Sequence, residues 1–168
     1  MKRLLVVAVA LIASISTLSA QNYMTVDSEK IFTSLTDYNT AIKEVETLST
    51  TYQANVDKRF EEVQNLYNNY VAQRNTLSAT ERDARESAIL KAEEEANLYQ
   101  ETIFSTDGEL MKRRVELISP IQKRVFEAIE AYAKANGFDL VLDTTSNATI
   151  LYKAENIDRT EAIIAILK

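Results

Sequence analysis

The chain has 168 residues, of which 25 are acidic and 19 are basic, so its net charge at neutral pH is −6. It contains no cysteine and no histidine. These absences exclude disulfides, nucleophilic catalysis by Ser-His or Cys-His pairs, and the commonest transition-metal ligand. The acidic balance argues against nucleic-acid binding, which depends on clustered Lys and Arg. We therefore expect a protein with no catalytic or metal site, no cofactor and no nucleic-acid partner.

The amino end has the layout of a cleaved secretory signal peptide. Lys2 and Arg3 precede an unbroken apolar run, and Ala20 followed by Gln21 is the expected cleavage point. The run is too short to span a bilayer, which needs about 20 residues. Residues 1–20 are thus predicted to be removed, and the mature chain to have at most peripheral membrane contact. Because cleavage removes two basic residues and no acidic one, 17 basic and 25 acidic residues would remain, a net charge of −8.

The first half of the mature chain is predicted to contain one very long helix. Only two glycines and one proline occur in the whole chain, which favours few and long elements. Residues 23–27 alternate as in a short strand, and Asp27 or Ser28 would cap a brief helix after it. From Tyr38 on, apolar residues recur in steps of three, four and seven, the spacing of one helix face. This stripe consists of Ile42, Val45, Tyr52, Val56, Val63, Leu66 or Tyr67, and Tyr70.

A second helical stretch of matching length follows a break at Leu77. Ser78 and Glu81 fit a capping box, in which a hydroxyl and a carboxylate each accept a hydrogen bond from a backbone N–H of the first turn. We interpret residues 37–119 as the two antiparallel arms of a helical hairpin. Gly108 within the second arm is either a tolerated glycine or a hinge that lets the arm bend. Pro120 is predicted to lie in the first turn of a further helix.

The carboxyl-terminal part is predicted to combine helices with two more strands. The glycine of Asn136-Gly137-Phe138 is placed to end a helix in the left-handed conformation, with Phe138 folding back on Tyr132 or Ala133. Strands are expected at 138–142 and 149–153, with a polar turn between them. Asp158 and Glu161 resemble a capping box that would start a closing, buried helix.

The strand-forming pieces at the two chain ends suggest an association domain. Three short strands would be hard for a lone subunit to stabilise. We therefore predict that residues 21–36 and 120–168 form a small head through which copies of the chain associate. The residues expected in this assembly head are Val26, Ile31, Phe32, Leu140, Leu142, Ile150, Tyr152, Ile164 and Leu167.

Aromatic residues lie on or beside both arm stripes. Packing within the hairpin explains most of them, while those that face outwards would suit contact with unfolded chains, because one end of such a side chain tolerates water. The candidates for this contact are Tyr52, Phe60, Tyr67, Tyr70, Tyr99 and Phe104.

The order of these segments resembles the Skp/OmpH family of periplasmic chaperones over essentially the whole mature length. The resemblance is carried by residues 23–32, the charged hairpin, residues 133–143, residues 150–152 and the closing segment 158–167. It implies a periplasmic homotrimer whose small β-containing head bears three coiled-coil-like helical arms. The arms would enclose unfolded outer-membrane proteins without ATP. The chain departs from the best-known members in charge, since they are strongly basic and this mature chain is acidic.

Two other functional classes are compatible with the residues alone. One is a structural coiled-coil envelope protein, or an adaptor with a single fixed partner. The other, which the composition favours less, is a hydrolase that works with carboxylates.

Overall fold

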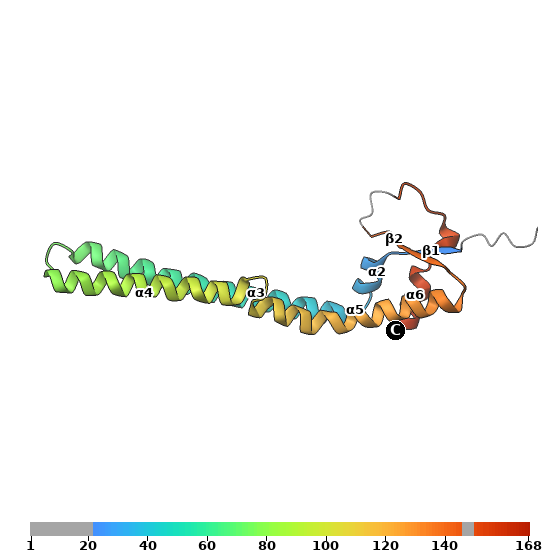
Figure 1. The fold of residues 1–168 in the computed structure, drawn as a ribbon, viewed down its shortest axis with the longest axis horizontal. Helices are drawn as coiled ribbons and strands as arrows, with labels where there is room; N and C mark the ends of the chain where they lie inside the picture. Colours follow the sequence, from blue (N-terminus) through green and yellow to red (C-terminus); the bar gives the residue numbers. More distant parts are fainter. Residues whose placement is uncertain (1–21, 146–149) are drawn as a thin grey trace, which may run out of the picture. The chain divides into compact units, whose positions relative to one another are not determined.

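The computed structural model describes residues 22–145 and 150–168 (Figure 1). The predicted signal peptide, with its cleavage point at Ala20 and Gln21, lies outside the described residues. The described chain is mainly helical with a small two-stranded parallel sheet, which confirms the predicted fold class. It divides into a hairpin unit, residues 36–123, and a terminal unit made of residues 22–35 and 124–168.

The hairpin unit consists of α3 (Thr36–Gln73), α4 (Ala79–Phe104) and the first part of α5 (Glu109–Ala135). After the turn at residues 74–78, α4 runs back alongside α3 (Figure 1). Three side-chain contacts join the arms at successive levels, namely Glu44 with Arg113, Arg59 with Tyr99, and Tyr70 with Glu86. The first two of these are 15 residues apart on α3 and 14 apart on the other arm. The two arms therefore advance almost in step.

Of the three buried residues of α3, Val56 and Tyr70 lie on the predicted stripe and Ala41 lies beside it. Val56 and Tyr70 are buried on α3, and Ala96 and Ile103 on α4, at separations that are multiples of seven. Such a stripe is narrow, because only two of every seven residues in each helix face the partner helix. Most of the remaining hairpin residues are exposed, and most of these are charged or polar.

The tip of the hairpin has the predicted capping box. The Ser78 hydroxyl accepts a hydrogen bond from the Glu81 N–H at 3.3 Å, and the Ser78 N–H donates to the Glu81 carboxylate at 2.8 Å. The Ser78 hydroxyl also donates to the Glu81 carboxylate at 2.6 Å, and this hydrogen bond, together with that from the Ser78 N–H, lowers the pKa of the Glu81 carboxyl. The helix α4 therefore starts at Ala79, while α3 ends at Gln73, four residues before the predicted border.

The second arm is interrupted at residues 105–108. The interpretation of Gly108 as a glycine tolerated inside a helix is wrong, since α4 ends at Phe104 and α5 begins at Glu109. The Gly108 N–H donates to the Ser105 carbonyl at 3.0 Å, and a Cβ atom on Gly108 would lie 2.5 Å from the Ile103 carbonyl oxygen. Only glycine fits this approach without a shift of the backbone. Bending at Gly108 stays a prediction.

The predicted helix start at Pro120 is also wrong, because Pro120 lies inside α5. A proline in a helix interior removes one backbone hydrogen bond and costs about 3 kcal/mol. Around it, Ile118, Ile121 and Val125 are all buried. Burial of this apolar face offsets the loss and keeps the helix continuous.

The terminal unit is built on two parallel strands. β1 (Tyr23–Val26) pairs with β2 (Leu140–Asp143), with Tyr23 opposite Leu140 and Val26 opposite Asp143. The unit also contains α2 (Ser28–Thr33), the short 3-10 helix η1 (Glu155–Ile157), α6 (Thr160–Leu167) and the last part of α5. Its buried core includes Met24, Val26, Ile31, Val125, Ile163 and Ile164.

One predicted helix start and one predicted helix end in this unit are confirmed. The Asp27 carboxylate accepts a hydrogen bond from the Lys30 N–H at 2.9 Å and so caps α2. After α5, Gly137 has a positive φ of 68°, and the Phe138 N–H donates to the Ala133 carbonyl at 2.9 Å. The Phe138 ring stacks on Tyr132 with 6.5 Å between centroids.

The predicted strand at 149–153 is wrong over its described part, because residues 150–153 have no strand structure. Leu151 and Tyr152 are 95% and 85% exposed, so no buried face holds an alternating segment there. The second edge of β1 is instead contacted by the segment before α6, where the Arg159 N–H donates to the Thr25 carbonyl at 2.9 Å.

The predicted capping box of the closing helix is wrong as well, since Arg159 occupies the N-cap position without a side-chain cap. The Asp158 carboxylate instead accepts hydrogen bonds from Thr160 N–H at 2.9 Å and Lys153 Nζ at 2.7 Å. Partial burial alone would raise the pKa of Asp158, but the hydrogen bonds from Lys153 and Thr160 outweigh it and lower the pKa to about 2. Asp158 thus joins residues 150–157 to the start of α6.

We expect Gly108→Ala to lower the free energy of unfolding by about 1–3 kcal/mol, because its Cβ would press on the backbone of Ile103. Urea unfolding followed by circular dichroism measures this loss. Thr106→Ala, in the same break, is the matched control and should change stability little. Equal stability of wild type and Gly108→Ala would contradict the steric argument.

Replacing Asp158 by Asn should destabilise the protein in a pH-dependent way. The folded-state pKa of about 2 lies below the unfolded value near 3.8. The stabilisation is therefore fully present above about pH 4 and is lost as the pH falls toward 2. Discounted for partial exposure, we expect Asp158→Asn to cost about 1–2 kcal/mol at pH 7. Thermal unfolding at several pH values, with the exposed Glu155→Gln as control, should show the difference shrinking below pH 4.

Candidate functional site

The described residues show few features of a reaction centre. Within residues 22–145 and 150–168, no group of three or more His, Cys, Asp or Glu side chains could hold a metal ion. Across the same residues, no helix combines the length and apolarity that crossing a membrane requires. The features that stand out are exposed apolar surfaces, one set on each unit.

The hairpin unit exposes large apolar side chains next to its buried stripe. Leu90 is 66% exposed, and Leu98, two turns further along α4, is 61% exposed. Glu93 and Glu94 lie between them in the sequence and line the same shallow surface. The full set of exposed large apolar residues on this unit is Leu66, Tyr67, Val71, Leu90, Leu98, Met111 and Val115. Apolar contact area is therefore dispersed among charges along both arms.

Two of the aromatic candidates, Tyr70 and Tyr99, form contacts between the arms. The hydroxyl of Tyr70 donates to the Glu86 carboxylate, and this hydrogen bond raises the pKa of Tyr70. The Arg59 guanidinium lies 4.2 Å from the centre of the Tyr99 ring. Tyr70 is buried and Tyr99 half-buried. Their contacts hold α3 against α4.

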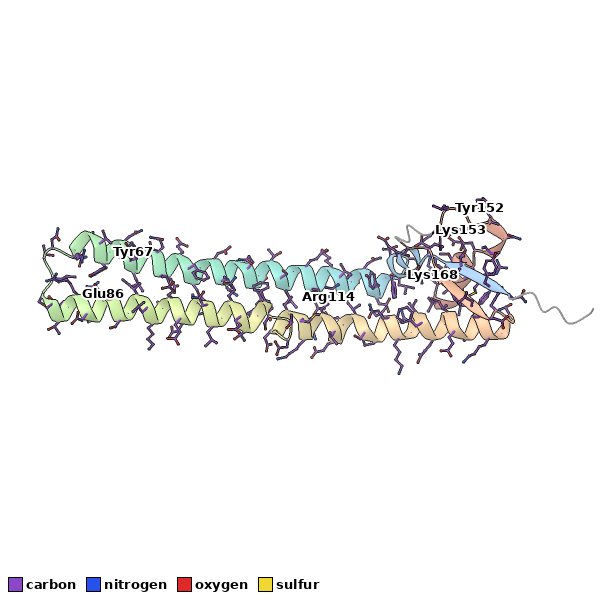
Figure 2. The ribbon with its side chains drawn as sticks, turned by 45° about the horizontal axis from the view of Figure 1, so that its top comes forward. Tyr67, Glu86, Arg114, Tyr152, Lys153 and Lys168 are labelled. Atoms are coloured by element: carbon purple, nitrogen blue, oxygen red, sulfur yellow. The ribbon has the colours of Figure 1, made fainter. Side chains whose placement is uncertain are left out.

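The remaining aromatic candidates are more open. Tyr67 is 51% exposed near the tip of the hairpin (Figure 2). Tyr52, Phe60 and Phe104 are half-buried. Apart from Leu66, which was placed on the stripe with Tyr67 as the alternative, the sequence interpretation missed the exposed aliphatic residues because it followed the stripe alone. The available signal was apolar residues beside the stripe, such as Val71 next to Tyr70 and Leu98 next to Tyr99.

An apolar groove lies at the interruption of the second arm. Its volume is about 450 Å³. It is lined by Val45, Glu46 and Ser49 of α3, Ile103 and Phe104 of α4, Ser105 and Thr106 of the break, and Leu110, Met111 and Arg114 of α5. Of the residues singled out from the sequence as contact candidates, Phe104 lines this groove.

The terminal unit exposes a second apolar surface. Leu140, Leu142 and Tyr152 of the predicted assembly residues are exposed. Leu142 and Tyr152 line a groove of about 730 Å³ together with Tyr23, Ile150 and Leu151. Leu151 was not singled out from the sequence, although it has the most exposed apolar side chain of those described.

The other predicted assembly residues lie deeper in the terminal unit. Val26, Ile31 and Ile164 belong to its buried core. The Phe32 ring packs edge-on against Phe126 with 6.1 Å between centroids. Ile150 and Leu167 are half-buried.

Comparison with known proteins places the chain in a family. No curated protein sequence is significantly similar to it. A crystal structure of an OmpH-like protein from Caulobacter crescentus CB15, a candidate outer membrane chaperone, has the same fold. It superposes with a TM-score of 0.67 at 14% identity, over 89% of this chain and 85% of that chain. The model of the OmpH-like outer membrane protein family matches residues 22–167, which confirms the resemblance seen in the sequence. The chain belongs to the OmpH-like outer membrane protein family.

Proposed function

We propose that the chain is an ATP-independent holdase chaperone of the periplasm that binds unfolded outer-membrane proteins and prevents their aggregation. It has no enzymatic activity and works as a homotrimer whose helical arms surround the client. The observation that carries this proposal is the family match over residues 22–167. The predicted signal peptide at residues 1–20 supports the compartment.

The surface of the hairpin supports a holding role. Its exposed apolar residues are spread over α3, α4 and α5 rather than gathered in one pocket. Each such residue contributes a weak contact with an unfolded chain, and many weak contacts in parallel give useful affinity through avidity. Aromatic residues such as the exposed Tyr67 suit partly hydrated contacts of this kind.

The terminal unit supports association. A two-stranded sheet is marginally stable by itself. The exposed side chains of Leu142, Leu151 and Tyr152 beside the sheet form an apolar surface of the kind that marks protein interfaces. Burial of this surface against other copies of the chain would stabilise sheet and oligomer together.

The charge of the chain favours apolar rather than electrostatic capture. The mature chain carries 25 acidic and 17 basic residues. Salt at a few hundred millimolar screens exposed charges and leaves apolar contacts intact. Binding of clients by this protein should therefore persist at high ionic strength.

A dilution assay tests the holding activity. A urea-denatured β-barrel membrane protein is diluted into buffer with the mature chain, and aggregation is followed by light scattering. We expect suppression at about one trimer per client, in the absence of ATP and also in 0.5 M salt, because apolar contacts resist screening. Unhindered aggregation at this ratio would refute the chaperone function and favour a structural coiled-coil protein or adaptor.

Shortening the arms tests their role separately from association. In the shortened variant, residues 60–98 are replaced by a flexible Gly-Ser turn that joins Arg59 to Tyr99. The contact between these two side chains across the arms is thereby preserved. Sedimentation should show the same trimer as the full-length mature chain, while suppression of aggregation should fall by about tenfold with the lost contact surface. Loss of the trimer would show that association depends on the arms, and a rod-like dimer of the full-length chain would contradict the assembly proposed above.

A further inference from the structure

The groove at the arm break arises from an unfilled layer in the packing between the arms. Ser49 lies seven residues after Ile42 and seven before Val56, at a position where the stripe calls for an apolar side chain. On the opposite arm, this level is occupied by the break at residues 105–108. A small polar side chain on one arm therefore faces a turn on the other, and the space between them stays open.

Apolar side chains form most of the walls of this space. Val45 and Ile103 lie on opposite arms, and Leu110 and Met111 close the α5 side. Met111 is 44% exposed, and methionine adapts readily to ligands of different shapes. The volume of about 450 Å³ falls within the range of ordinary ligand sites and gives room for an aromatic side chain.

The rim of the groove carries one charge of each sign. Glu46 of α3 and Arg114 of α5 both line it, and Figure 2 labels Arg114 on α5. Within residues 22–145 and 150–168, neither side chain forms an ion pair, with the other or with a third residue. A complementary ligand thus has an apolar centre with an acidic group on one side and a basic group on the other.

We infer that this groove is a specific subsite for a polypeptide, which inserts one aromatic or large aliphatic side chain and places an acidic and a basic neighbour against Arg114 and Glu46. The inference rests on the proposed holdase function and deepens it. It gives the arm one defined anchoring point in addition to its dispersed apolar contacts.

A lipid is a poorer fit to the same surface. An acyl chain could enter the apolar part, but its anionic headgroup would meet Glu46 as well as Arg114. The hairpin around the groove is rich in further carboxylates, which repel anionic lipid surfaces. An unfolded polypeptide can supply both signs of charge within a few residues of an apolar side chain.

Peptide binding to the full-length mature chain tests the inference. The probe is a short, fluorescently labelled, unstructured peptide with one phenylalanine between an aspartate and a lysine, and its affinity is measured by anisotropy. Ser49→Leu should fill the groove and weaken binding by about tenfold, the effect typical of losing one apolar anchor. Ser87→Leu adds the same side chain at an exposed position of α4 and should leave the affinity unchanged. Met111→Ser, which removes a wall without adding bulk, should also weaken binding.

Reversal of the rim charge gives a second, independent readout. Arg114→Glu should weaken binding of the original peptide, and replacement of the aspartate in the peptide by lysine should restore it. Thermal unfolding checks that Ser49→Leu is folded, and a filled core layer should raise its melting temperature. Unchanged peptide affinity in folded Ser49→Leu would overturn the inference. So would equal binding of a peptide with serine in place of phenylalanine.

Two further outcomes separate this inference from the proposed function. If wild type suppresses aggregation of the denatured barrel protein but the peptide affinity of Ser49→Leu is unchanged, only the groove inference fails. If wild type fails to suppress aggregation, the holdase function fails. If Ser49→Leu loses binding to phosphatidylglycerol vesicles while its peptide affinity is unaffected, the groove binds lipid. This result would overturn the assignment of the groove to a polypeptide.

Discussion

The hairpin depends on a narrow apolar stripe kept in one register along its length. The contacts of Glu44 with Arg113, and of Tyr70 with Glu86, mark two distant levels at which the arms still meet face to face. A pair of helices with so little buried surface gains modest stability per residue, and helices of this kind depend on packing rather than propensity. The narrow stripe leaves most side chains of both arms exposed, and the proposed holding of unfolded chains would rely on this exposure.

The break at residues 105–108 is accommodated without loss of this register. Glu44 and Arg59 are 15 residues apart on α3, and their partners Arg113 and Tyr99, which lie on either side of the break, are 14 residues apart. Gly108 makes this possible, because its backbone approaches Ile103 too closely for any side chain. The interruption thus leaves a groove open between the arms at this level.

Much of this fold follows from local patterns in the sequence, and the exceptions have physical causes. The caps at Ser78 and Gly137 were predictable because each depends on hydrogen bonds within a few residues. The helix start predicted at Pro120 is wrong because burial of apolar side chains along α5 outweighs the preference of proline for the first turn of a helix. The segment at 150–153 looked like a strand by alternation, yet the edge of β1 is contacted by residues 158–159, which is a tertiary choice that no local pattern encodes. The groove was hidden for the same reason, since it requires Ser49 and the break to face each other.

The acidic charge and the exposed apolar residues are best understood together. Isolated apolar side chains such as Leu90 and Leu98, separated by Glu93 and Glu94, do not form the large contiguous patches that drive self-association. An unfolded chain can still reach them one at a time, because its backbone adapts to their spacing. In the proposed holdase each contact would be weak, so a client that begins to fold could withdraw from these residues in succession without an external energy source. Under the proposed holdase function, a surface of this kind would hold clients by the number of its contacts.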